Sequence, residues 1–131
     1  MGEGVKPDGQ PWWVDVEIPP GAALPPLRLA LHGLSAATSG NYRRWFEVDG
    51  ERFAHTIDPR TGRPIVNGVA SVTVLHPECM YADAYATAIT VLGAEDGLRF
   101  ANRLGLAAHI VSQSAGAWGE AMSLAFTAML D

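Results

Sequence analysis

The feature that most constrains this chain is a run of β-branched residues that leads directly into helical sequence. Residues 69–75 (VASVTVL) are typical of a central strand, because branched side chains pack well on a pleated sheet. Pro77 follows, and the alanine-rich residues 78–92 then predict a helix that Gly93 ends. Residues 94–104 predict a second helix immediately after the first. Consecutive helices do not fit an alternating βα pattern, so we expect both to be inserted together into a sheet built from other strands.

Extended segments surround these helices in the sequence. Strand patterns occur at residues 12–18, 27–34, 45–48, 51–57 and 106–112. Asp49-Gly50 is a strong hairpin signal, because a type I′ turn needs positive φ at both central residues. Residues 58–68 and 113–118 are expected to form loops, and residues 119–130 favour a strand over a helix. The sequence therefore predicts one α+β domain over residues 1–131, with a mostly antiparallel sheet and two consecutive helices inserted.

Composition limits the classes of function open to the chain. Hydrophobic residues make up 48% and charged residues 18%, so the chain can bury a core and is not of the disordered type. The net charge of -5 argues against a nucleic-acid partner, because phosphate binding favours a basic surface. No apolar run is long enough to span a membrane, and we expect no secretory signal in this chain. The one cysteine, Cys79, can form no internal disulfide and is expected to be structural.

Asp83 and Thr87 form the first candidate site. They lie four residues apart in the predicted helix, so both side chains project from one face. A carboxylate and a hydroxyl are the hard oxygen ligands that Mg²⁺ prefers. Asp83 is also expected near the helix N-terminus, where unpaired N–H groups favour a phosphate. The alternative is structural: Asp83 stabilises the helix dipole and Thr87 hydrogen-bonds back to a carbonyl.

Two further candidates precede the helices. His55 and Asp58, in the stretch HTIDPRTGRP, can form an acid–base or orienting pair. The alternative is that Asp58 caps its own turn, as Asp-Pro commonly does, while His55 is a half-buried strand residue. Thr38, Ser39 and Gly40 predict a small polar loop able to present backbone N–H groups to an anion. Such loops are common, so this motif alone is weak.

Taken together and in order, these stretches resemble the ApbE family of Mg²⁺-dependent flavin transferases, the FAD:protein FMN transferases. The resemblance rests on the TSGNY segment at residues 38–42, an H-x-x-D-P-x-T-G-x-P turn that begins at His55, and an SVTV strand that leads into an ADAYAT helix. It covers residues 2–130. Full family members are considerably longer, so we expect this chain to correspond to their C-terminal portion, without the upstream half.

The resemblance implies a role for each candidate residue. Asp83 and Thr87 would be the Mg²⁺ ligands, joined by a backbone carbonyl from the upstream half. His55 and Asp58 would lie near the scissile pyrophosphate, where a histidine can accept the proton of the attacking hydroxyl. Residues 38–40 would border the flavin site.

The implied reaction splits FAD and attaches FMN through a phosphoester to a threonine of a target flavoprotein, with Mg²⁺ as cofactor. Alternatives are hydrolysis of FAD to FMN and AMP, and flavin-nucleotide binding or assembly without turnover, because much of the flavin pocket would belong to the upstream half. A structural domain whose site is completed by a partner subunit is a third. The resemblance also implies that the protein is a lipoprotein, located in the periplasm or anchored to the outer face of a membrane. Finally, it predicts an exposed apolar face around Trp12, Trp13 or Trp118, left uncovered or covered by a second copy in a homo-oligomer.

Overall fold

The computed structural model contains ten strands and three helices in the residues that it describes. These are residues 6–16, 18–19, 21–22, 24–25, 27–40, 45–48, 51–54, 56–65, 67–114 and 116–130. For residues 45–48 and 51–54 the backbone alone is described. The strands are β1 (Trp12–Asp15), β2 (Arg28–Leu31), β3 (Ser35–Gly40), β4 (Trp45–Val48), β5 (Glu51–Ala54), β6 (Ile57–Asp58), β7 (Arg63–Pro64), β8 (Val69–His76), β9 (Ala107–Ser114) and β10 (Ala117–Met122). The helices are α1 (Cys79–Leu92), α2 (Ala94–Leu104) and α3 (Leu124–Ala128).

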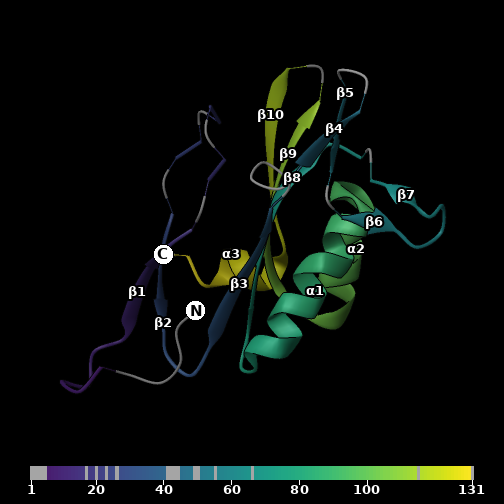
Figure 1. Ribbon diagram of the computed structural model, residues 1–131. Helices are drawn as coiled ribbons and strands as arrows, with labels where there is room; N and C mark the ends of the chain where they lie inside the picture. The colour runs from purple at the N-terminus through teal and green to yellow at the C-terminus, as the bar shows by residue number, and fades with distance from the viewer. Residues whose placement is uncertain are drawn as a thin grey trace.

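A four-stranded antiparallel sheet in the order β10-β9-β8-β3 forms the centre of the molecule. Helices α1 and α2 cover one face of this sheet, while α3 and the β1–β2 hairpin lie on the other (Figure 1). The smaller β4–β5 and β6–β7 hairpins form separate two-stranded sheets. The α+β class, the antiparallel pairing and the two consecutive helices predicted from the sequence are confirmed.

Strand β8 is buried on both faces, and branched or apolar side chains occupy most of its positions. Val72 and Val74 point toward the helices and join a core with Ala82 and Ala86 of α1. Leu75 points the other way and joins a second core with α3 and the β1–β2 hairpin. Because successive side chains of a strand alternate between faces, a strand covered on both sides buries nearly every side chain, and in β8 these include the polar Ser71 and Thr73.

Helices α1 and α2 follow the predicted bounds closely. α1 begins one residue later than expected, with Glu78 at its N-cap, and α2 spans the predicted residues 94–104. Gly93 joins the helices with φ of 94°, a conformation that favours glycine. Gly97 of α2 lies so close to α1 that a Cβ built on it would be 2.6 Å from the Cγ2 atom of Ile89. Glycine at this position therefore permits the tight helix packing.

Residues 35–40 form strand β3, where the sequence predicted a loop at residues 38–40. The stretch SAATSG lacks large branched side chains, so its local sequence gave no strand signal. It is extended because it pairs along its length with β8, with Thr38 opposite Thr73. The small side chain of Ala37 packs against the core beneath α1. Pairing and packing with distant residues thus override a weak local preference.

The C-terminal residues 119–130 contain a strand followed by a helix, which corrects the single strand favoured from the sequence. Ser123 ends the strand and caps α3, since its side chain accepts a hydrogen bond from the backbone N of Phe126 at 3.3 Å. The loop predicted at residues 113–118 is also wrong, because β9 and β10 both extend into it and pair as a hairpin.

The remaining elements agree with the sequence in kind, though several are shorter. The β1–β2 and β4–β5 hairpins are antiparallel, and the Asp49-Gly50 turn lies outside the described residues. The region 58–68, predicted as a loop, includes all of the small β6–β7 hairpin except Ile57. None of the helices in the described ranges is long and apolar enough to cross a membrane.

Two tryptophans of β1 are exposed in this chain, as the sequence led us to expect. The exposed fraction is 42% for Trp12 and 56% for Trp13, whereas Trp118 is half-buried. The Lys6 ammonium lies 5.7 Å from the ring centre of Trp12. Because neighbouring residues of a strand point to opposite faces, the β1–β2 hairpin presents one exposed aromatic ring on each of its sides.

Candidate functional site

Asp83 and Thr87 lie one turn apart on the exposed side of α1, opposite the buried residues Ala82 and Ala86. The Thr87 hydroxyl donates to the backbone oxygen of Asp83 at 3.1 Å. This is the back-bonding that the structural alternative predicts, and it occupies the hydroxyl proton. The lone pairs of the Thr87 oxygen stay free, so the same geometry leaves the oxygen able to act as a ligand.

The expected phosphate position at the start of α1 is not supported for Asp83. Because α1 begins at Cys79, Asp83 lies in the second turn, and no acidic residue lies in the first. The backbone ladder has already begun by then, since the N of Ala82 donates to the oxygen of Glu78 at 3.1 Å. The unpaired N–H groups of a helix belong to its first turn, so the dipole argument does not apply to this carboxylate.

Asp58 forms a compact turn with Arg60. Its carboxylate accepts hydrogen bonds from the backbone N of Arg60 at 2.9 Å, from Nε at 3.1 Å and from the guanidinium NH2 at 3.0 Å. Hydrogen bonds from the Arg60 side chain, then from its backbone, lower the pKa of Asp58 below its ordinary value. Asp58 is therefore ionised at neutral pH, which suits an orienting carboxylate and not a proton donor. Its predicted partner His55 lies outside the described residues.

The turn that holds Asp58 is fastened to the C-terminal end of α1. The Arg60 guanidinium reaches the backbone oxygen of Val91 at 3.5 Å. The Asn67 amide donates to the oxygen of Thr90 at 2.9 Å and to that of Val91 at 3.1 Å. Because Val91 lies one turn beyond Thr87, these contacts bring the turn near the helix segment that carries the candidate ligands.

Sequence reasoning missed Asn67. It lies in a turn-rich stretch and contacts residues 23 and 24 positions away, which no local pattern predicts. The only available hint was an asparagine followed by glycine just before the long strand β8, a pattern that indicates a turn and nothing more.

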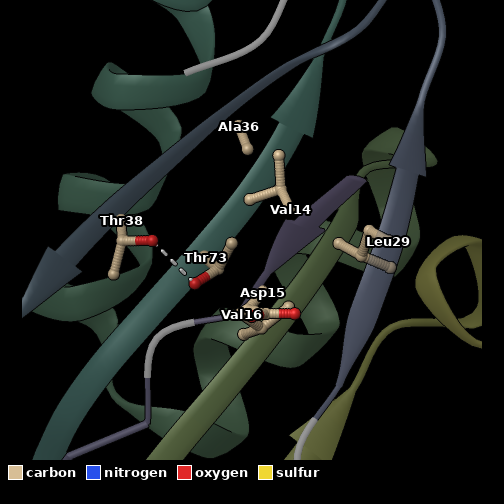
Figure 2. A pocket seen from close by; sticks show the side chains of 7 residues that line it. All are labelled: Val14, Asp15, Val16, Leu29, Ala36, Thr38 and Thr73. Atoms are coloured by element: carbon tan, nitrogen blue, oxygen red, sulfur yellow. Dashed lines mark hydrogen bonds between the residues drawn. The ribbon is translucent and has the colours of Figure 1, made fainter. Parts of the chain in front are cut away.

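The predicted flavin segment is divided between the two faces of the sheet. Thr38 faces the β1–β2 side, where its hydroxyl lies 2.9 Å from that of Thr73. Figure 2 shows both hydroxyls in a groove of about 480 Å³, together with Val14, Asp15, Val16, Leu29 and Ala36. Ser39 follows Thr38 and so faces the α1 side, opposite Val72. Of these two side chains, only that of Ser39 therefore lies on the face of the sheet that α1 covers.

A buried histidine pairs with a glutamate on the β1–β2 side of the sheet, away from α1. His109 has no exposed surface, and its Nε2 atom lies 2.8 Å from Glu120 Oε2. Its ring stacks on Phe126 of α3, with 5.5 Å between the ring centres. In the described part of the chain no three His, Cys, Asp or Glu side chains gather as a metal cage.

Asp83 and Thr87 suit Mg²⁺ in the chemistry of their donors. Both offer hard oxygens, and no hydrogen bond or ion pair joins the Asp83 carboxylate to another residue in the described ranges. Mg²⁺ commonly takes one or two protein ligands and completes its octahedron with water and substrate phosphates. Two exposed oxygens on one helical face fit that pattern.

Comparisons with known proteins agree with these observations. The model of the ApbE family matches residues 1–110. The FAD:protein FMN transferase of Escherichia coli K12 is 38% identical over 130 residues, which cover 97% of this chain and 36% of that protein. The protein of the same name from Vibrio cholerae is 46% identical over 100 residues, which cover 76% of this chain and 30% of that protein.

Solved structures show the same fold. The apo form of the Pseudomonas stutzeri flavinyl transferase ApbE superposes with a TM-score of 0.81 at 40% identity, over 97% of this chain and 39% of that one. The ApbE protein of Thermotoga maritima superposes with a TM-score of 0.80 at 33% identity, over 96% of this chain and 40% of that one. The chain thus spans well under half the length of these relatives. By its family match, its identity to these proteins and its fold, the chain belongs to the ApbE family.

Proposed function

We propose that this chain carries the metal-binding and pyrophosphate-facing part of a Mg²⁺-dependent FAD:protein FMN transferase. The observation that carries the proposal is the joining of two motif segments at one helix: α1 bears Asp83 and Thr87, and the Asp58 turn is fastened to its end. Relatives that bear this name match nearly the whole chain. The substrates would be FAD and a flavoprotein with an acceptor threonine.

In the proposed reaction, the acceptor threonine oxygen bonds to the FMN phosphorus while the bond from that phosphorus to the AMP oxygen breaks. His55 accepts the proton of the hydroxyl, a step worth about 10²–10⁴-fold in rate. Mg²⁺, held by Asp83 and Thr87, would neutralise the charge that develops on the pyrophosphate. Asp58, ionised through its bonds with Arg60, orients its neighbours and does not donate a proton.

A second candidate is flavin-nucleotide binding without turnover. It is kept because the chain spans only 36% of the Escherichia coli relative and 40% of the Vibrio cholerae flavin transferase ApbE structure, so the activity of those whole proteins does not by itself assign turnover to this chain. Hydrolysis of FAD to FMN and AMP is a variant of the first candidate in which water replaces the threonine hydroxyl. For either activity we propose a periplasmic site or the outer face of a membrane.

The deciding experiment incubates the chain with FAD, Mg²⁺ and a flavoprotein that carries an acceptor threonine. Transferase activity gives AMP and an acceptor whose mass is increased by FMN, and the increase is lost when the threonine is replaced by valine. Equal amounts of free FMN and AMP with no acceptor adduct would show hydrolysis. Mg²⁺-dependent retention of FAD with neither product would favour the binding role. Absence of both binding and products would contradict the proposed function.

A further inference from the structure

We propose that Asn67 is a positioning residue for the metal site, one that fixes the end of α1 against the segment carrying Asp58. This inference rests on the proposed function, since it concerns how Asp83 and Thr87 are held for Mg²⁺. Asn67 itself touches neither residue. It acts through the backbone of the helix that presents them.

The Asn67 side chain makes three hydrogen bonds that join two parts of the fold. Its amide nitrogen donates to the backbone oxygens of Thr90 at 2.9 Å and Val91 at 3.1 Å. Its amide oxygen accepts from the backbone N of Val69, the first residue of β8, at 3.2 Å. One planar group therefore ties the last turn of α1 to the start of the central strand. The β6–β7 hairpin, which ends three residues before Asn67, lies beside this end of α1 in Figure 1.

These bonds replace pairing that a helix end lacks. The last four carbonyl groups of a helix have no partner within the helix itself. Here Gly93 N closes on the oxygen of Ile89 at 3.1 Å, and Asn67 satisfies the oxygens of Thr90 and Val91. The Asn67 side chain also packs beside Gly93, since a Cβ built on Gly93 would lie in van der Waals contact with the Asn67 amide nitrogen, at 3.6 Å. Among the described residues outside the helix pair, Asn67 thus makes the shorter hydrogen bonds to the C-terminal end of α1, and Arg60 makes a longer one at 3.5 Å.

Thr87 lies three residues before Thr90, in the turn next to the one that Asn67 holds, so a displaced helix end would disturb the backbone that carries the Thr87 oxygen. Mg²⁺ tolerates little deviation from octahedral geometry, with ligand distances of about 2.0–2.1 Å. Loss of groups that orient metal ligands typically costs about 10–100-fold in metal affinity. We therefore expect removal of the Asn67 amide to weaken Mg²⁺ binding by about 10-fold.

The test compares Asn67→Ala and Asn67→Asp with the matched control Asn102→Ala. Asn67→Asp keeps the acceptor for Val69 N but loses the amide donor, and it adds a negative charge at the helix C-terminus. Asn102 makes a similar bond elsewhere: its side-chain oxygen accepts from the backbone N of Leu124 at 2.8 Å and joins α2 to α3. The readouts are the Kd for Mg²⁺ in the presence of FAD, measured by titration calorimetry, and the Tm of each variant.

We expect both Asn67 variants to raise the Kd for Mg²⁺ by about 10-fold, while Asn102→Ala lowers the Tm and leaves the Kd at the wild-type value. A wild-type Kd in the Asn67 variants, or an equal increase in Asn102→Ala, would overturn the positioning role and leave the proposed function standing. A wild-type chain that binds no Mg²⁺ with FAD would overturn the proposed function and this inference with it.

Discussion

Replacing Gly97 by alanine should destabilise the protein, although alanine favours a helix more than glycine does. Gly97 lies in the interior of α2 and faces α1. A Cβ at this position would lie 2.6 Å from Ile89 Cγ2 and 3.1 Å from the Ile89 backbone oxygen. The first distance is far inside van der Waals contact, and the second atom belongs to a helix backbone that cannot rotate away.

Two opposing terms set the size of the effect. Alanine gains about 1 kcal/mol over glycine in a helix interior. Overpacking a well-filled core costs about 1–3 kcal/mol, and here a side-chain atom and a backbone atom must both yield. The upper part of that range applies, so we expect a net loss of about 1–2 kcal/mol in the free energy of unfolding. For a chain of this length that loss lowers the Tm by about 3–8 °C.

Urea unfolding of Gly97→Ala, Ile89→Leu and the double variant measures this directly. Leucine lacks the Cγ2 atom that the new Cβ would meet, so the double variant should recover about half of the loss from Gly97→Ala, a coupling of about 0.5–1 kcal/mol. A Gly97→Ala protein as stable as the wild type would refute the close approach of α1 and α2. A coupling of zero would show that Ile89 is not the obstacle.

Two further predictions concern other hydrogen-bonded groups. Ser123→Ala should lower the free energy of unfolding in urea by about 2–3 kcal/mol. The buried hydroxyl donates to Leu106 O at 2.6 Å and accepts from Ala108 N at 2.9 Å, and the substitution would leave both partners unpaired. A loss below about 0.5 kcal/mol would contradict this prediction. Arg60→Ala should raise the pKa of Asp58 toward its ordinary value of 3.8, as followed by NMR titration of the carboxyl carbon. Because the folded-state pKa of Asp58 is lowered, the stability that Arg60 adds through this pair is fully present above about pH 3.8 and is lost as the pH falls through the lowered pKa. An unchanged pKa in the variant would show that Arg60 is not its cause.

The part of the fold predicted from the sequence is the part governed by local signals. The β-branched run of β8 and the alanine-rich period of α1 are each specified by neighbouring residues, and both helices end at glycines. These signals give the element type and its bounds to within a residue or two. The candidate pair Asp83 and Thr87 was found for the same reason, because four-residue spacing on a helix is a local property.

The features that the sequence did not predict depend on contacts between distant residues. β3 is a strand because it pairs with β8, some 35 residues away, through contacts such as Thr38 with Thr73. Because β3 is a strand, the side chains of Thr38 and Ser39 point to opposite faces of the four-stranded sheet, an arrangement that the predicted loop did not imply. Asn67 caps a helix that ends 25 residues later in the chain. Ser123, in contrast, carried a recognisable N-cap signal that the ambiguous spacing of the C-terminal residues obscured.

The most direct test of the central claim is a Mg²⁺ titration, in the presence of FAD, of the wild-type chain, Asp83→Ala and the control Glu95→Ala. Glu95 is an exposed carboxylate of α2 that pairs with Arg99 at 2.6 Å and is not a proposed ligand. We predict that the wild type and Glu95→Ala bind Mg²⁺ with the same Kd, and that Asp83→Ala raises the Kd by at least about 10-fold. The same Kd in all three proteins would contradict the assignment of α1 as the metal-bearing helix.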